Sequence, residues 1–153
     1  MSRHVAEIVW RSDGEFASGR YSRRHEIRFD GGATIVGSSS PDVVPAPLSD
    51  PAGVDPEEAL VGAAAACHML WFLDLARRFG LDIAAYRDQA EGEMGRNAAG
   101  RTAIVRITLR PDIAFAGPAP DAAAIERLHH EAHERCFIAN SLNSEIVVAA
   151  PRR

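Results

Sequence analysis

One long segment near the middle of the chain, Asp55 to Phe79, most constrains the fold. It begins with Asp55, a favourable helix N-cap, followed by Pro56, which suits the first helical turn. Glu58 follows at the position that completes a capping box, and Gly80 is a typical helix stop. These signals predict one long helix.

The body of this predicted helix, Leu60–Leu73, is apolar around nearly its whole circumference, with Gly62 and His68 as exceptions. A helix that is apolar on all sides belongs in a core or a subunit interface. A few short strands and one further helix offer too little surface to bury it, so we expect a homodimer that packs two such helices together. The apolar run is shorter than the roughly 20 residues that span a membrane, and we therefore expect no membrane span.

The chain has 153 residues, a size typical of one domain over 1–153. Its net charge of −4 gives no general attraction for nucleic acid. The N-terminus lacks a continuous apolar segment, so we expect no signal peptide and a cytoplasmic location. In a reducing cytosol, two cysteines favour free or redox-active thiols over a structural disulfide.

Alternating apolar residues between turn signals predict short strands, and Asp121 caps a second, amphipathic helix running to about Cys136. In the strand around residue 27 we expect Ile27 and Phe29 to face inward. The order of elements predicts an α+β fold: an antiparallel sheet, a long buried central helix and the amphipathic helix. The strands are expected at Val5–Trp10, His25–Phe29, Ala33–Val36, Tyr86–Met94, Thr102–Leu109 (with Ile113–Phe115 as an extension) and Ser144–Ala150.

The two cysteines are the candidate reactive groups. Cys67 lies in the middle of the apolar helix and Cys136 at the end of the second helix. Either alone is compatible with a buried, inert thiol. Together they provide what two-cysteine peroxide reduction requires: one thiolate attacks the O–O bond and becomes a sulfenic acid, and the second thiol condenses with it to a disulfide.

Such a mechanism needs a cation, because apolar surroundings keep a thiol protonated. An arginine-rich stretch near the N-terminus is the obvious source, and the planar guanidinium can bind a carboxylate while still facing a thiolate. The alternative is that these arginines are solvated strand and loop residues. They are Arg20, Arg23, Arg24 and Arg28.

Several segments together resemble the OsmC/Ohr family of thiol-dependent hydroperoxide reductases, which are peroxidases of the peroxiredoxin type. The resemblance covers most of the chain. It rests on Asp55-Pro56-Glu57-Glu58-Ala59-Leu60, on Ala66-Cys67-His68-Met69-Leu70-Trp71, on Tyr21-Ser22-Arg23-Arg24-His25, and on Cys136 with Ser141-Leu142.

The resemblance implies roles for four residues. Cys67 corresponds to the peroxidatic cysteine and Cys136 to the resolving one. Glu57 corresponds to the carboxylate that holds the catalytic arginine, for which we expect Arg23, with Arg20 as the second choice. No cofactor and no metal are implied.

The resemblance also implies partners. Family members form intertwined homodimers with active sites at the subunit interface. They reduce organic hydroperoxides in oxidative-stress defence, and a dithiol such as a dihydrolipoyl group serves some as reductant.

Two residues depart from the family pattern. Phe137 follows Cys136 where the family usually has proline, and His68 after Cys67 is less usual. We expect His68 to be a core histidine with its hydrogen bonds satisfied. Glu57 and Cys67 lie about 15 Å apart along a straight helix, so one compact site needs a helix break at Gly62, a bridging arginine or a group from a partner chain.

Two alternatives belong to other functional classes. The spacing of His129, His133 and Cys136 places them on one helix face, where they could hold zinc, although a solvated histidine face is the commoner outcome. The apolar helix and the long loop before it could also line a pocket for an unreactive lipid-like ligand, in a binding module without chemistry.

Overall fold

The computed structural model describes residues 1–152, and the chain divides into two compact units. The first comprises Met1–Ala59 and the second begins at Leu60. The expectation of a single domain stays a prediction.

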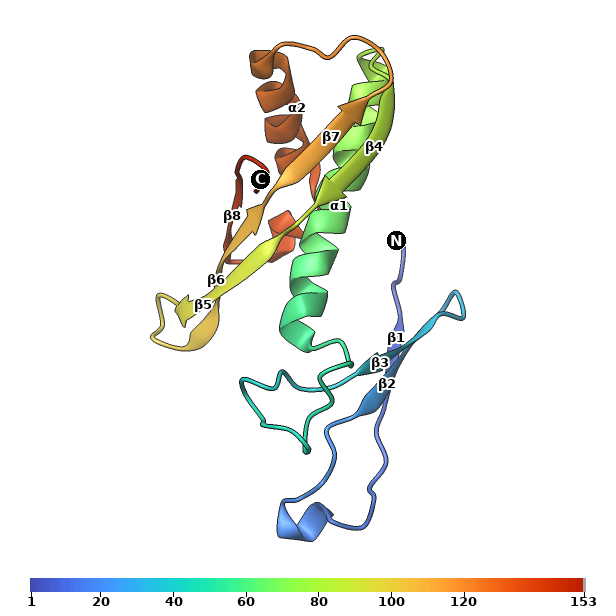
Figure 1. Ribbon diagram of the computed structural model, residues 1–153, viewed down its shortest axis with the longest axis vertical. Helices are drawn as coiled ribbons and strands as arrows, with labels where there is room; N and C mark the ends of the chain where they lie inside the picture. Colours follow the sequence, from blue (N-terminus) through green and yellow to red (C-terminus); the bar gives the residue numbers. More distant parts are fainter. Residues whose placement is uncertain (153) are drawn as a thin grey trace. The chain divides into compact units, whose positions relative to one another are not determined.

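The first unit contains a three-stranded antiparallel sheet in the order β1-β2-β3 (Figure 1). The strand predicted at residues 25–29 is confirmed with the same bounds. Gly32 turns the chain between β2 and β3 with φ at 89°, a conformation that glycine adopts without strain. Phe29 does not face inward as expected, because its side chain is 41% exposed. The elements are β1 (Ala6–Val9), the 3-10 turn η1 (Phe16–Ser18), β2 (His25–Phe29) and β3 (Thr34–Gly37).

Helix α1 (Pro56–Arg78) begins with the predicted capping box. The Glu58 backbone N–H donates to the Asp55 carboxylate at 2.7 Å, and the Asp55 N–H donates to the Glu58 carboxylate at 3.2 Å. These two bonds satisfy donors that a helix start otherwise leaves free. The helix is continuous through Gly62.

The second unit combines two helices with two small sheets (Figure 1). One sheet pairs β4 with β7, and the other has the order β5-β6-β8. All pairs are antiparallel except β6 with β8, which is parallel. The elements are β4 (Ile83–Asp88), β5 (Glu91–Arg96), β6 (Thr102–Leu109), β7 (Pro111–Phe115), α2 (Ala122–Arg135), the 3-10 turn η2 (Ala139–Ser141) and β8 (Glu145–Val148).

The structure corrects the strands expected around residues 86–94 and 113–115. The first is split between β4 and β5, and the second is a separate strand, β7, that pairs with β4. The bounds of β6 are as predicted. The Asp121 carboxylate accepts the Ala124 N–H at 2.7 Å, so α2 starts at the expected cap.

Two apolar clusters hold the second unit together. In the C-terminal half of α1, Phe72, Leu75 and Ala76 pack against Leu128 and Ala132 of α2. Figure 1 shows α2 beside this half of α1. Nearer its N-terminus, α1 packs against β6 and β8. That second cluster contains Ala64, Ile107 and Leu109, with Val61, Ile104 and Ile146 around them.

Much of α1 from residue 60 onward is left uncovered by the rest of the second unit. Exposed apolar residues follow one face of the helix at Ala63, Ala66 and Leu70. By length and composition alone, α1 could cross a membrane, a test that core helices of soluble proteins also meet, and 28% of its most apolar stretch is buried. The argument against a membrane span from the length of the apolar run is therefore wrong, and the expected lack of a membrane partner stays a prediction.

Candidate functional site

Cys67 lies near the middle of α1 with a partly exposed side chain, and its thiol is free. The preceding and following turns place alanines and apolar side chains around it. The thiol is thus held on a rigid helix in apolar surroundings while staying within reach of a small molecule. A nucleophile needs this accessibility.

Cys136 closes helix α2. Its backbone is extended, with φ −69° and ψ 110°, so the helix ends there, and its N–H still donates to the His133 carbonyl at 3.1 Å. The sulfur accepts the Ala139 N–H at 3.4 Å. The thiol is free but 1% exposed, which makes it far less accessible than Cys67.

The two thiols interact. Burial, followed by a side-chain hydrogen-bonding interaction with Cys67, raises the pKa of Cys136 to about 11. Two cysteines 69 positions apart in sequence are brought together because α1 and α2 pack against each other. A buried thiol that stays protonated beside a more accessible one fits the division into a resolving and an attacking cysteine.

The residue after Cys136 also has a defined environment. Phe137 is 69% exposed and packs edge-on against Trp71, with ring centres 5.6 Å apart. The guanidinium of Arg135 lies 5.8 Å from the centre of the same indole. Trp71 of α1 therefore anchors the residues on both sides of Cys136.

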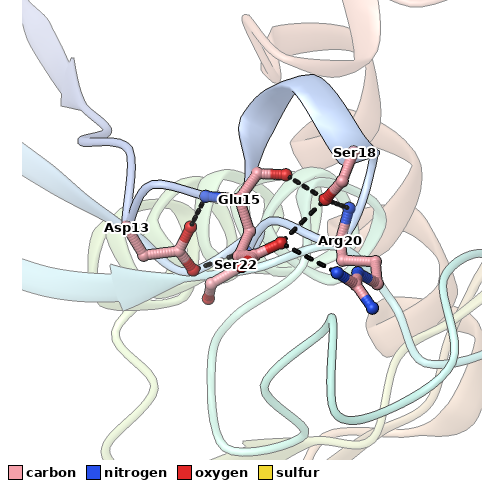
Figure 2. Close-up of polar contacts among 5 residues, drawn as sticks. All are labelled: Asp13, Glu15, Ser18, Arg20 and Ser22. Atoms are coloured by element: carbon pink, nitrogen blue, oxygen red, sulfur yellow. Dashed lines mark hydrogen bonds and ion pairs between the residues drawn. The ribbon is translucent and has the colours of Figure 1, made fainter.

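Three of the four candidate arginines are engaged by carboxylates. Arg20 pairs with Glu15 at 3.3 Å, in a network where Ser18 donates to Glu15 (Figure 2). Asp13 accepts the Ser22 N–H in the same loop, and backbone hydrogen bonds lower the pKa of Asp13. The remaining two follow the same pattern, Arg24 with Asp50 and Arg28 with Glu7 and Glu26.

Arg23 differs from these three. Its guanidinium donates to the backbone carbonyls of Gly19 and Tyr21 and lies 3.8 Å from the centre of the Tyr21 ring. It pairs with no carboxylate in the part of the chain that the structure describes. Its positive charge is thus positioned by neutral groups and remains available to an anion.

Arg23 also lines a hollow of about 420 Å³ in the first unit. The aromatic rings of Trp10, Phe16 and Tyr21 contact one another there, with centres 5.0 to 5.7 Å apart. A cation beside an apolar, aromatic wall suits a molecule with a bulky apolar part and a polar end.

Glu57 lies in the first turn of α1, half-buried. Within residues 1–152 it forms no ion pair. Because α1 is unbroken at Gly62, a helix break does not bring Glu57 toward Cys67, and ten residues of helix separate them by about 15 Å. The remaining ways to bring Glu57 and Cys67 into one compact site are a bridging arginine or a group from a partner chain.

The zinc alternative is contradicted by the structure. Among the described residues, no group of three or more His, Cys, Asp or Glu side chains is arranged to hold a metal ion. His129 is 8% exposed, so it does not belong to a solvated face, and its Nδ1 lies 3.0 Å from Nε2 of His68. Cys136 interacts with Cys67 instead.

The His68–His129 bond is the feature that the sequence did not reveal. His68 is a core histidine as expected, 1% exposed, but only one of its two nitrogens has a partner within the described chain. The expectation of satisfied hydrogen bonds is therefore wrong for Nδ1. The i, i+4 and i+7 spacing of His129, His133 and Cys136 was a usable signal, because it places His129 on the face that carries Cys136.

Comparisons with known proteins agree on one family. A family model described as OsmC-like protein matches residues 49–150. The search of curated proteins gave no match. Among solved structures, an OsmC-like protein of unknown function from Vibrio cholerae is 44% identical, with a TM-score of 0.95 over 98% of this chain and 99% of that chain.

More distant structures share the fold alone. An organic hydroperoxide resistance protein from Legionella pneumophila is 14% identical, with a TM-score of 0.72 over 99% of this chain and 98% of that chain. The organic hydroperoxide resistance protein OhrB of Bacillus subtilis is 18% identical, with a TM-score of 0.66 over 97% of this chain and 98% of that chain. Since the family model covers well over half of the chain, the protein belongs to the OsmC-like family.

Proposed function

We propose that the protein is a thiol peroxidase that reduces organic hydroperoxides with Cys67 as the attacking cysteine and Cys136 as the resolving one. The observation that carries this proposal is the interaction of the two thiols across α1 and α2, one partly exposed and the other buried. Membership of the OsmC-like family supports it, because that fold is shared by organic hydroperoxide resistance proteins.

The proposed chemistry has two steps on the protein. The Cys67 thiolate attacks the terminal peroxide oxygen; an S–O bond forms, the O–O bond breaks, and the alkoxide leaves and takes up a proton to become the alcohol. Cys136 then attacks the sulfenic sulfur, losing its thiol proton, and the released hydroxide is protonated to water. An external dithiol, such as a dihydrolipoyl group, reduces the resulting disulfide by exchange.

Arg23 is the proposed partner of the Cys67 thiolate, oriented by Glu57. Two observations support this choice: Arg23 has no carboxylate partner among residues 1–152, and Glu57 has no arginine partner there. Because α1 holds Glu57 and Cys67 about 15 Å apart, we assign the assembly of the site to a homodimer in which the two chains exchange groups.

The uncovered side of α1 supports that dimer. Ala63, Ala66 and Leu70 form an apolar stripe that the second unit leaves exposed. Small residues allow two helices to approach closely, and pairing the stripes of two copies removes the apolar surface from water. The aromatic hollow beside Arg23 favours peroxides with a bulky apolar group. We place this activity in oxidative-stress defence in the cytoplasm.

The test compares three proteins with cumene hydroperoxide and a dithiol reductant. Wild type should turn over; Cys67→Ser should lose turnover completely; Cys136→Ser should react once and stop at the sulfenic acid, trapped by dimedone. If Cys67→Ser turns over like wild type, the proposed function is wrong. A wild type that binds the apolar peroxide without reducing it would favour the lipid-like binding module instead.

A further inference from the structure

Two histidines form an isolated polar contact inside the helix pair. His68 of α1 and His129 of α2 are 1% and 8% exposed, and their Nε2 and Nδ1 atoms lie 3.0 Å apart. The two rings are nearly parallel, at 14°, and Phe72 stacks on His129 with ring centres 4.4 Å apart. This packing fixes both imidazoles in orientation.

Both rings are neutral near pH 7. Burial, together with smaller electrostatic effects of His129 and His133, lowers the pKa of His68 to about 4. Burial also lowers the pKa of His129 to about 4. A neutral imidazole carries one N–H and one bare nitrogen. One ring therefore donates to the other through the bonded nitrogens, and each ring keeps one further nitrogen for another partner.

The two ends of the pair face different surroundings. His129 lines a surface hollow of about 390 Å³, together with Glu126, Pro111 and Val148. At the other end, Nδ1 of His68 is buried without a hydrogen-bond partner within the described chain. A buried imidazole nitrogen without a partner is costly, and such a group calls for a functional explanation.

The sequence places the pair close to the two cysteines along each helix. His68 directly follows Cys67, and Cys136 comes two helical turns after His129 on the same side of α2. The interaction between the two thiols and the hydrogen bond between the two imidazoles therefore both join α1 to α2. The charged or titratable groups that bear on the pair are His133 and Glu126 on α2 and, through Phe72, Tyr86 of β4.

We propose that His129 and His68 form a proton relay between the surface hollow and the thiol site, which rests on the proposed peroxidase function. When Cys67 attacks the peroxide, the departing alkoxide takes the proton on His68 Nδ1. His129 Nδ1 passes its proton to His68 Nε2, and His129 Nε2 takes a proton from solvent. Both rings change tautomer and neither keeps a charge.

The second step of the reaction returns both histidine rings to their starting tautomers. Cys136 must lose its thiol proton to attack the sulfenic sulfur, and its raised pKa makes a base necessary. In the relay, His68 Nδ1 accepts that proton. His68 Nε2 then returns its proton to His129 Nδ1, and His129 Nε2 releases a proton to solvent. The hydroxide released from the sulfenic acid takes a proton from solvent, so protons balance over the cycle.

The test uses His129→Gln, which keeps a polar side chain at this position but cannot shift a proton, and His130→Gln, an exposed neighbour on α2, as the matched control. Stopped-flow oxidation of Cys67 by cumene hydroperoxide is measured in H2O and D2O. His129→Gln should slow oxidation by about a hundredfold and lose the solvent isotope effect. The control, His130→Gln, should keep the wild-type oxidation rate and the solvent isotope effect. The melting temperature of each variant shows whether it is folded.

A wild-type oxidation rate and isotope effect in a folded His129→Gln would overturn the relay. If wild type itself fails to oxidise Cys67, the proposed function fails, and the relay is judged by a measurement that needs no peroxide. In ¹⁵N-labelled protein, exchange of the His68 ring N–H with solvent should be at least about tenfold slower in His129→Gln than in wild type and the control. Equal exchange rates would refute the relay; if His129→Gln does not fold, His129→Asn is measured against the same two outcomes.

Discussion

The guanidinium carbon of Arg23 lies 3.8 Å from the centre of the Tyr21 ring, so an aromatic face, and not a carboxylate, positions this cation. The neighbouring Arg20 lies in the opposite situation, bound to Glu15. A cation held by neutral groups keeps its charge available for another anion. This difference within four residues of sequence underlies the first prediction.

Arg23→Ala should slow Cys67 oxidation by organic hydroperoxide by about a hundredfold, because the thiolate loses a preorganised cation. Arg20→Ala, the matched control, should stay within about twofold of wild type, since its partner is an exposed carboxylate. Stopped-flow kinetics on both variants provides the comparison. Similar rates for Arg23→Ala and wild type would show that another arginine serves the thiolate.

The buried thiol predicts selective alkylation. At pH 8 the Cys136 thiol is protonated, because burial raises its pKa to about 11, and its side chain is 1% exposed. Iodoacetamide should therefore modify Cys67 at least about tenfold faster than Cys136, as measured by peptide mass spectrometry over time. Faster labelling of Cys136 would contradict the assigned order of the two thiols.

The histidine pair predicts a loss of stability in acid. Between about pH 4 and pH 6.5 the unfolded chain binds protons on His68 and His129 while the folded chain does not. The free energy of unfolding should thus be highest above pH 6.5 and fall as the pH drops toward 4. From pH 7.5 to pH 5 we expect a loss of about 2–4 kcal/mol.

Urea unfolding at both pH values measures this loss. His129→Gln removes one of the two buried titrating rings and should have a smaller pH dependence than wild type. His130→Gln, on the exposed side of α2, should keep the wild-type dependence. A wild-type stability that is equal at pH 7.5 and pH 5 would contradict the neutral, buried state of the pair.

The exposed stripe on α1 predicts a dimer. Wild type should sediment as a dimer at micromolar concentration, and Leu70→Asp should shift it toward monomer, because a carboxylate in an apolar interface is costly to bury. Ala123→Asp, at an exposed position of α2, is the control and should remain dimeric. A wild-type monomer would show that the stripe is covered in some other way.

The sequence predicted the elements whose signals are local. Asp55 and Asp121 marked the starts of both helices, and alternation in residues 102–109 gave β6 with its observed bounds. The break between β4 and β5 was missed, because Gln89 and Ala90 carry no strong turn signal. The inward placement of Phe29 was wrong, because alternation does not determine how much of a sheet face the rest of the fold covers.

The candidate site was also predictable only in part, because contacts between residues far apart in the sequence leave no local pattern. Residue type and position singled out Cys67 and Cys136, and the helix packing brings them together. The partner of His129 lies 61 residues away on another helix, and no local pattern encodes that bond. The choice among four arginines also required the structure, since each looks alike in sequence while three have carboxylate partners.

The central claim is that Cys67 and Cys136 act together on an organic hydroperoxide. One equivalent of cumene hydroperoxide is mixed with reduced protein in a stopped-flow instrument, and the product is digested without reductant for mass spectrometry. The proposed mechanism predicts rapid consumption of the peroxide and a Cys67–Cys136 disulfide in stoichiometric yield. Unconsumed peroxide with both thiols still free would contradict it.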